Sequence, residues 1–154
     1  MKTLVLIKPD AWHRGIVGRI ISRFEEKGLT ISKMELISAS LEQLEKHYVE
    51  HKDKPYFMEL INFMILGPVV AIKLTGPDVV QIVRKMVGES SFSNKCSPGT
   101  IRGDFSVSGR YNVVHASSSE EQADRELRIW FGDESREEYK CTDSYIRCFE
   151  LGEA

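Results

Sequence analysis

The order of strand-like and helix-like segments is the feature that most constrains the fold of this 154-residue chain. Short apolar runs with β-branched residues, at residues 3–7 and 69–74, predict buried strands. Alternating apolar and polar residues over 30–39 predict a half-exposed strand. Val113 and Val114 predict a further strand that ends at His115. We therefore expect four strands in a chain of single-domain length.

Helical segments separate these strands. Val17, Ile20, Ile21 and Phe24 are spaced as one face of a helix, which is expected to end near Gly28 because glycine suits a left-handed cap. Further helices are expected after a Ser40/Gln43 capping box, from Pro55, over residues 79–87 after the turn at 76–78, and after a Ser119/Gln122 cap.

Two strand–helix–strand halves result from this order. They favour an α+β, ferredoxin-like (split βαβ) fold, with a four-stranded antiparallel sheet and helices packed on it. A doubly wound parallel sheet is the competing topology, but it normally has more strands, each followed by a regular crossover helix.

Charge and cysteine content limit the partners and the compartment. Lys plus Arg number 21 and Asp plus Glu number 23, so the formal net charge is −2 and no nucleic-acid partner is expected. No apolar run is long enough for a membrane span or a signal peptide. Cys96, Cys141 and Cys148 are widely spaced, which argues against a disulfide framework or a zinc ribbon. We expect a cytoplasmic protein that contacts no membrane.

The common phosphate-binding motifs, G-x-x-x-x-G-K-[ST] and G-x-G-x-x-G, are absent from the sequence. Residues 89–103 instead form a long stretch rich in Ser, Gly, Asn and Pro, without clear periodicity. Compact domains rarely keep a structureless loop of this length without a use for it, so this loop is a candidate functional segment.

Several side chains suit phosphoryl transfer. His115 is expected at a strand end before a helix N-terminus, where a neutral imidazole is a nucleophile and an incoming phosphate is favoured. Lys8 follows the first strand, and Arg84, Ser90 and Arg102 lie in or near the long loop. Taken singly, such a histidine is more often structural, and such lysines and arginines are more often solvated surface residues.

A competing pattern is His47-Tyr48-Val49-Glu50-His51, which matches the H-x-x-E-H of one class of zinc peptidase. On a helix the two histidines would share a face, but a zinc site needs a third ligand and a general base. Solvated helix histidines are the simpler interpretation. Of the adjacent aromatic residues Tyr56 and Phe57, one is expected to pack in the core, and an exposed one is suited to stacking on a nucleobase.

Taken together, these segments occur in one order with several others. They are Lys8-Pro9-Asp10, His47-Tyr48, Asp53-Lys54-Pro55-Tyr56-Phe57, Gly67-Pro68-Val69-Val70-Ala71, Pro98-Gly99-Thr100-Ile101-Arg102-Gly103-Asp104-Phe105, Asn112-Val113-Val114-His115-Ala116-Ser117 and Trp130-Phe131. In this order they resemble the nucleoside diphosphate kinase family over about residues 1–139. The resemblance implies one domain over residues 1–154, in which 132–154 are a family-variable tail. It also implies a ferredoxin-like fold and a homo-oligomer, either a hexamer or a tetramer.

The resemblance also implies roles for individual residues. His115 is expected to take the γ-phosphate of a nucleoside triphosphate and pass it to a nucleoside diphosphate by a ping-pong mechanism, with Glu126 orienting its imidazole. The remaining implied groups are Lys8, Arg84, Arg102 and Asn112 for the phosphates and ribose, Ser90 for a phosphate oxygen, Tyr48 and Ser117 beside the histidine, and Tyr56 for the base. Mg²⁺ is expected as cofactor, held mainly through the nucleotide, with no dedicated metal ligands in the protein.

Some positions depart from the family pattern. Tyr56 stands where Phe is usual, Ser90 where Thr is usual, and Gly109 where an aliphatic residue often covers the base. The loop over residues 90–98 is longer by about one residue, and the tail after Tyr139 matches poorly. An alternative is therefore a nucleotide- or partner-binding relative that has lost catalysis. Tight nucleotide binding without phosphoryl exchange would favour that alternative, whereas an enzyme that uses His115 is expected to lose nearly all turnover in His115→Ala.

Overall fold

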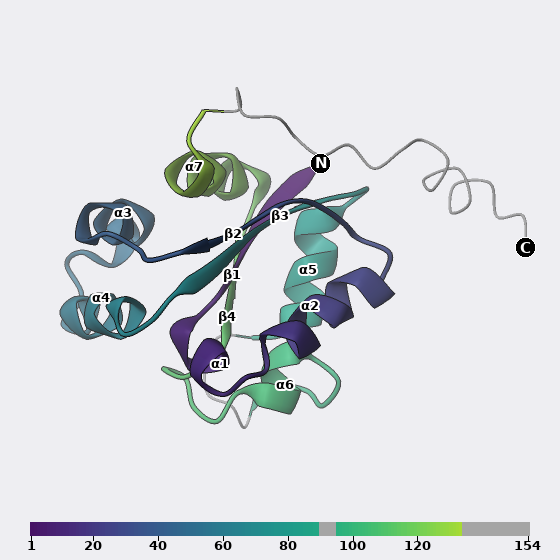
Figure 1. The fold of residues 1–154 in the computed structure, drawn as a ribbon, viewed down its shortest axis with the longest axis horizontal. Helices are drawn as coiled ribbons and strands as arrows, with labels where there is room; N and C mark the ends of the chain where they lie inside the picture. The colour runs from purple at the N-terminus through teal and green to yellow at the C-terminus, as the bar shows by residue number, and fades with distance from the viewer. Residues whose placement is uncertain (90–94, 134–154) are drawn as a thin grey trace, which may run out of the picture.

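A four-stranded antiparallel sheet forms the centre of the computed structural model, which describes residues 1–89 and 95–133 (Figure 1). The strands are β1 (Lys2–Ile7), β2 (Thr30–Ile37), β3 (Val69–Thr75) and β4 (Val114–Ala116), in the order β2-β3-β1-β4. Every strand pair in this sheet is antiparallel, so the ferredoxin-like prediction is confirmed and the doubly wound alternative is wrong.

Helices cover both faces of the sheet (Figure 1). The helices are α1 (Pro9–His13), α2 (Val17–Glu26), α3 (Leu41–His47), α4 (Phe57–Ile65), α5 (Val79–Val87), α6 (Ile101–Phe105) and α7 (Glu120–Phe131), with a 3-10 turn at Val49–His51. Since side chains alternate along a strand, Val5 and Ile7 of β1 join the core under α2 and α5, whereas Leu4 and Leu6 join the core under α3, α4 and α7. No helix in the described part of the chain is long and apolar enough to span a membrane.

The predicted helix starts are largely confirmed. The hydroxyl groups of Ser40 and Ser119 accept hydrogen bonds from the backbone N–H groups of Gln43 and Gln122. The reciprocal half of the first capping box does not form, because the Gln43 side chain donates to the carbonyl of Ile129 instead. The helix expected from Pro55 begins at Phe57.

Two short helices were not expected from the sequence, and one strand end was wrong. α1 directly follows Lys8, and α6 occupies the end of what was expected to be a long loop. The last strand runs to Ala116, so His115 lies in the middle of β4 and not at its end. Val113 stays outside the strand because its φ of 59° is left-handed.

Candidate active site

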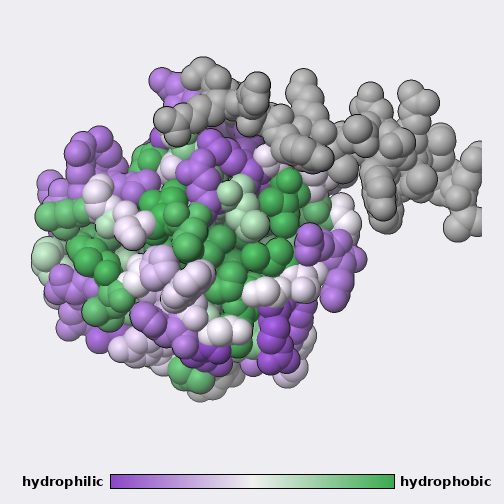
Figure 2. Space-filling view, in the orientation of Figure 1, coloured by the Kyte–Doolittle hydropathy of each residue, from purple (hydrophilic) through white to green (hydrophobic). Residues whose placement is uncertain are grey.

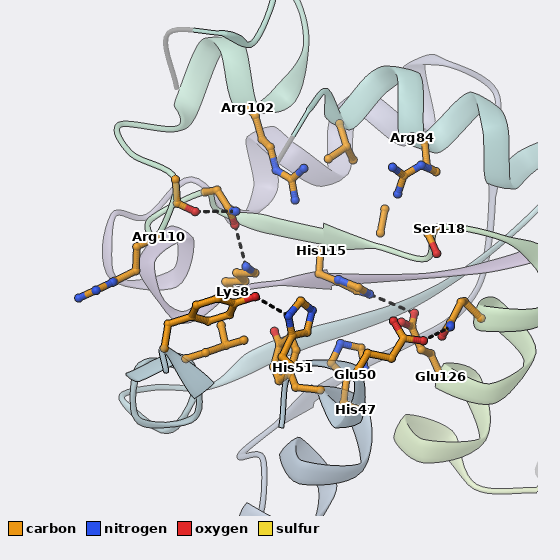
Figure 3. Close-up of a pocket in the computed structure, with 18 of the residues that line it drawn as sticks. Lys8, His47, Glu50, His51, Arg84, Arg102, Arg110, His115, Ser118 and Glu126 are labelled. Atoms are coloured by element: carbon orange, nitrogen blue, oxygen red, sulfur yellow. Dashed lines mark hydrogen bonds and ion pairs between the residues drawn. The ribbon is translucent and has the colours of Figure 1, made fainter. Parts of the chain in front are cut away.

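The residues that the sequence singled out line one pocket of about 550 Å³ (Figure 3). Among the described residues they are Lys8, Tyr48, Tyr56, Arg84, Arg102, Asn112, His115 and Glu126. Arg84, Arg102, His115 and Glu126 lie in α5, α6, β4 and α7, whereas the other four lie just outside β1, α3, α4 and β4. The fold thus brings together side chains that are far apart in sequence. Two further residues were predicted: Ser117 lies behind the pocket and bonds to Glu126, and Ser90 lies outside the described residues.

His115 is held by a carboxylate. Its Nε2 lies 3.0 Å from Oε2 of Glu126, which also accepts a 2.6 Å hydrogen bond from the Ser117 hydroxyl. Burial opposes ionisation of Glu126, but the hydrogen bond and charge of His115, with the Ser117 hydroxyl, outweigh it and lower the pKa of the carboxyl. Since an ionised carboxylate only accepts hydrogen bonds, the proton of a neutral His115 ring lies on Nε2, and the Nδ1 lone pair is free.

The turn before β4 is fixed by the start of α1. The backbone N–H of Val113 donates to the Asp10 carboxylate at 3.1 Å, and the Val113 carbonyl accepts from the Lys8 N–H at 2.9 Å. The Lys8 ammonium donates to Oδ1 of Asn112 at 2.7 Å. These contacts hold Val113 in its left-handed conformation and so set where His115 enters the pocket.

Three cations converge on the space beside His115 (Figure 3). Burial, reinforced by the charge of Arg102, lowers the pKa of Lys8 to about 8. Burial also lowers the pKa of Arg102 to about 10, and its guanidinium donates to the carbonyls of Gly88 and Val114 at 3.0 and 2.7 Å. Arg84 completes the group from the last turn of α5. Such a cluster favours a polyanionic ligand.

The zinc interpretation of His47 and His51 is not supported. α3 ends at His47, and His51 lies in the following 3-10 turn, so the two do not share a helix face. Nδ1 of His51 pairs with the Tyr56 hydroxyl at 2.8 Å. Tyr48 is buried beside His47, and burial, with the negative charge of Glu126, raises the pKa of its hydroxyl.

A family model described as nucleoside diphosphate kinase matches residues 1–136. The chain belongs to the nucleoside diphosphate kinase family. Membership makes it a nucleotide-binding phosphotransferase of the kinase class.

Named relatives extend this result. The chain is 47% identical over 132 residues to a nucleoside diphosphate kinase of Exiguobacterium sp., covering 86% of this chain and 94% of the relative. It is 49% identical over 130 residues to the nucleoside diphosphate kinase of Corynebacterium diphtheriae, covering 84% of this chain and 96% of the relative.

Solved structures agree on the fold. An apo nucleoside diphosphate kinase from Encephalitozoon cuniculi superposes with a TM-score of 0.85 at 40% identity, covering 88% of this chain and 92% of that one. A halophilic nucleoside diphosphate kinase from Halobacterium salinarum, in complex with CDP, superposes with a TM-score of 0.86 at 34% identity, covering 94% of this chain and 95% of that one.

The far end of the pocket differs from the usual family pattern. Tyr56 is 44% exposed there, whereas the adjacent Phe57 is buried, as expected for one of the pair. Gly109 leaves open the side where family members often have an aliphatic residue. Arg110 of the same loop pairs with Glu59 of α4 at the pocket mouth, a contact that links the two sides.

Sequence reasoning missed several residues of this nucleoside diphosphate kinase site. Asp10 was noted as part of a segment, but its bond to Val113 depends on a helix too short to show periodicity. The bond from Trp130 to His47, and the pairing of Glu59 with Arg110, join positions far apart in sequence, for which no local pattern exists.

Proposed function

We propose that this chain transfers the γ-phosphate of a nucleoside triphosphate to a nucleoside diphosphate through a phosphorylated His115. The observation that carries the proposal is the 3.0 Å pairing of His115 Nε2 with Glu126, which directs the free lone pair to Nδ1. That nitrogen belongs to a pocket lined by Lys8, Arg84 and Arg102. A nucleophile beside clustered positive charges is what phosphoryl transfer requires.

In the first half-reaction, the Nδ1 lone pair of His115 attacks the γ-phosphorus. A P–N bond forms while the bond from the γ-phosphorus to the bridging oxygen breaks, and the diphosphate leaves with the electron pair. The ring then carries both the phosphoryl group and the Nε2 proton, so it is cationic and the Glu126 carboxylate stabilises it. In the second half-reaction, a terminal phosphate oxygen of a new diphosphate attacks phosphorus. The P–N bond breaks, its electron pair returns to Nδ1, and His115 is restored as a neutral ring.

The other residues have binding roles in this proposal. Lys8, Arg84 and Arg102 neutralise charge on the phosphate oxygens, and Asn112 holds the Lys8 ammonium and contacts the ribose. The hydroxyl of Tyr48 is buried, has no hydrogen-bond partner among residues 1–89 and 95–133, and lies in the pocket wall beside the reacting group. Ser90 is assigned a phosphate contact by family resemblance alone.

Tyr56 stacks on the base in this proposal. Because stacking contacts a face that every base has, we expect the enzyme to accept several bases.

Mg²⁺ is the proposed cofactor. The phosphate end of the pocket is lined by cations, and its buried acid, Glu126, is engaged with His115 and Ser117. The group formed by His47, His115 and Glu126 offers two nitrogens, whereas Mg²⁺ prefers oxygen ligands. This donor set fits an ion carried by the nucleotide phosphates, where it would neutralise charge that develops during transfer.

The test is incubation with γ-labelled ATP and Mg²⁺, without an acceptor, beside His115→Ala. We expect label in an acid-labile, base-stable form that GDP removes and that the variant lacks. Nucleotide binding without any label would instead favour a non-catalytic relative. Label retained by His115→Ala would exclude His115 as the nucleophile.

We also propose that the chain forms a homo-oligomer, a hexamer or a tetramer, and acts in the cytoplasm as a single domain. β2 ends the sheet order, and its Met34 and Leu36 are 51% and 58% exposed. Figure 2 shows apolar residues gathered across one face, over the region where Figure 1 shows β2. Light scattering coupled to gel filtration tests the oligomeric state, and a monomeric mass would contradict the proposed homo-oligomer.

A further inference from the structure

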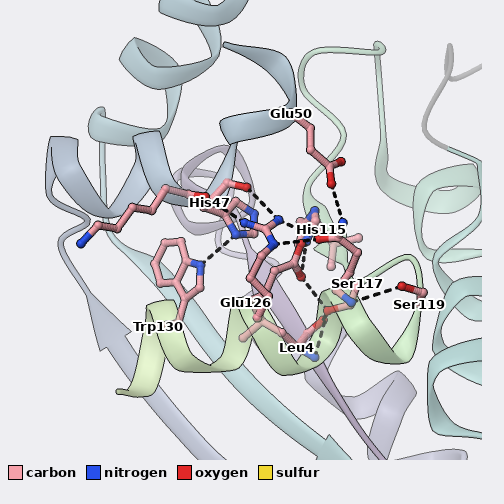
Figure 4. Close-up of polar contacts among 12 residues, drawn as sticks. Leu4, His47, Glu50, His115, Ser117, Ser119, Glu126 and Trp130 are labelled. Atoms are coloured by element: carbon pink, nitrogen blue, oxygen red, sulfur yellow. Dashed lines mark hydrogen bonds and ion pairs between the residues drawn. The ribbon is translucent and has the colours of Figure 1, made fainter. Parts of the chain in front are cut away.

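His47 is a buried imidazole for which the proposed mechanism has no role. It ends α3, is 3% exposed, and lies in the wall of the pocket (Figure 4). Its ring centroid is 4.6 Å from that of His115, 4.5 Å from that of Tyr48 and 5.6 Å from that of Trp130. All three contacts are nearly perpendicular, at 81° to 82°, which is a preferred geometry for aromatic rings.

Trp130 determines which nitrogen of His47 carries the proton. The indole N–H of Trp130 can only donate, and it lies 3.1 Å from Nδ1 of His47. Nδ1 is therefore the acceptor, and the single proton of the neutral ring is on Nε2. Nε2 is buried without a hydrogen-bond partner in the described part of the chain. Such an unpaired donor is costly, and it calls for an explanation.

The same hydrogen bond keeps the His47 ring uncharged. A second proton would have to bind Nδ1, which already faces the Trp130 N–H. Burial lowers the pKa of His47 well below its ordinary value, and nearby charges act in the same direction. The groups concerned are His115, Arg125, Lys8 and His51, and the carboxylate of Glu126 lies in the same cluster.

An uncharged His47 matters because of Glu126. Donor or acceptor atoms of His47, His115 and Glu126 lie within 4.8 Å of one another. A cationic His47 would compete with His115 for the carboxylate and draw it away from Nε2. A neutral ring leaves Glu126 to His115 and Ser117, and its edge contact restrains rotation of the His115 ring.

We propose that His47, locked by Trp130, is a positioning residue that holds the imidazole of His115 in line for attack on phosphorus. The inference rests on the proposed phosphohistidine mechanism. Three separate groups then fix the His115 ring: the β4 backbone that carries it, Glu126 at Nε2, and the ring of His47 packed against it.

The deciding variant is His47→Asn, because the Asn side chain keeps an acceptor near the position of Nδ1 for Trp130 but loses the ring edge. We expect the single-turnover rate of His115 phosphorylation at saturating ATP and Mg²⁺ to fall by about ten- to a hundred-fold. The dissociation constant for ADP is expected to change less than about twofold, because His47 lies beneath the nucleophile and not among the phosphate-binding cations.

Leu44→Ala is the matched control, since Leu44 is fully buried on the same helix and belongs to the hydrophobic core, but is not among the residues that line the pocket. It is expected to lose thermal stability while the folded protein phosphorylates at the wild-type rate. If His47→Asn phosphorylates at the wild-type rate, His47 is only a packing residue and the inference is wrong.

Trp130→Phe keeps an aromatic ring but removes the N–H together with the five-membered part of the indole, so it breaks the hydrogen bond to Nδ1 of His47 and tests the inference even if His47→Asn fails to fold. We expect it to lower the phosphorylation rate and to change the ¹⁵N imidazole NMR signals of His47, one of four histidines. An unchanged rate and an unchanged Nε2–H tautomer would overturn the inference. Wild-type protein that takes no label at all would overturn the proposed function instead, which keeps the two failures distinct.

Discussion

At the scale of single residues, Glu126 carries two hydrogen bonds on one carboxylate oxygen, from His115 and Ser117. Glu126→Gln keeps the shape and an acceptor oxygen but removes the charge that stabilises the cationic phosphohistidine ring. We expect turnover to fall at least about tenfold with a nearly unchanged KM. Ser117→Ala, which removes one hydrogen bond and no charge, is expected to have a smaller effect in the same steady-state assay. Equal effects would show that the charge is unimportant.

Lys8 links nucleotide affinity to pH. Burial and the charge of Arg102 lower the pKa of Lys8 to about 8. The free protein therefore loses this positive charge as pH rises through 8. A bound phosphate favours the charged form, so binding above this pH must take up a proton. We expect the ADP affinity to be flat below about pH 7 and to weaken by up to about tenfold per pH unit above pH 8. Titration calorimetry at several pH values measures this, and Lys8→Gln is expected to bind weakly without the pH dependence.

Tyr56 separates stacking from hydrogen bonding at the base end. Tyr56→Ala removes the ring, and the loss of stacking is expected to weaken ADP binding by about 1–3 kcal/mol. Tyr56→Phe removes only the hydroxyl that pairs with His51, and because this side chain is 44% exposed we expect less than about 1 kcal/mol. Dissociation constants for ADP, GDP and CDP test both variants. A Phe variant as weak as the Ala variant would mean that the hydroxyl, and not the ring, contributes the affinity.

At the scale of elements, α6 positions Arg102 through a close approach of the backbone. A Cβ on Gly103 would collide with the carbonyl of Ser97 and lie 2.8 Å from the Thr100 hydroxyl oxygen, which caps the helix. Gly103→Ala is therefore expected to cost about 1–3 kcal/mol of stability and to weaken ADP binding, because α6 must shift. Gly18→Ala, in the first turn of α2 where nothing lies within 4 Å of an added Cβ, is the control and is expected to be neutral or slightly stabilising by thermal melting.

The longer elements could be predicted from the sequence, whereas the short ones could not. Continuous apolar runs identified β1 and β3, which are buried on both faces, and helical periodicity identified α2 and α5, which each bury one apolar face. α1 and α6 have five residues each, little more than one turn, so they leave no periodic signal and depend on tertiary contacts. β4 is the short element that was predicted, although it was expected to end at His115 and runs to Ala116. Among the described strands it pairs only with β1, and its start is set by Asp10 through the left-handed Val113.

In the candidate site too, residues that belong to sequence motifs could be predicted, whereas contacts between distant residues could not. His115 and the phosphate-binding cations were identified by motif order, and the structure brings them around one pocket, although their roles stay predictions. The packing around His47 depends on α3 and α7 meeting on one face of the sheet. Because that contact joins residues 83 positions apart, no local pattern in the sequence could reveal it.

At the scale of the whole molecule, the pocket joins elements that the sheet alone does not hold together. Lys8, Arg84 and Arg102 follow β1 or lie in α5 and α6, and their like charges repel one another when no ligand is bound. A polyphosphate that bridges them is expected to stabilise the entire fold. At an ADP concentration of 100 times Kd, linkage gives about 2.7 kcal/mol, which is visible as a rise in Tm.

Two arginines of this cluster are expected to affect that stabilisation differently. The side chain of Arg84 makes no hydrogen bond or ion pair within residues 1–89 and 95–133, and its backbone carbonyl still accepts from the Gly88 N–H in the variant, so Arg84→Ala should melt like wild type without ligand. A tenfold loss of affinity would then remove about 1.4 kcal/mol of the stabilisation by ADP.

Arg102→Ala leaves the carbonyls of Gly88 and Val114 without their donor, and it is expected to cost about 1–3 kcal/mol of stability even without ligand. Melting curves with and without ADP decide this, and equal ligand-free Tm values for both variants would show that Arg102 does not brace the fold.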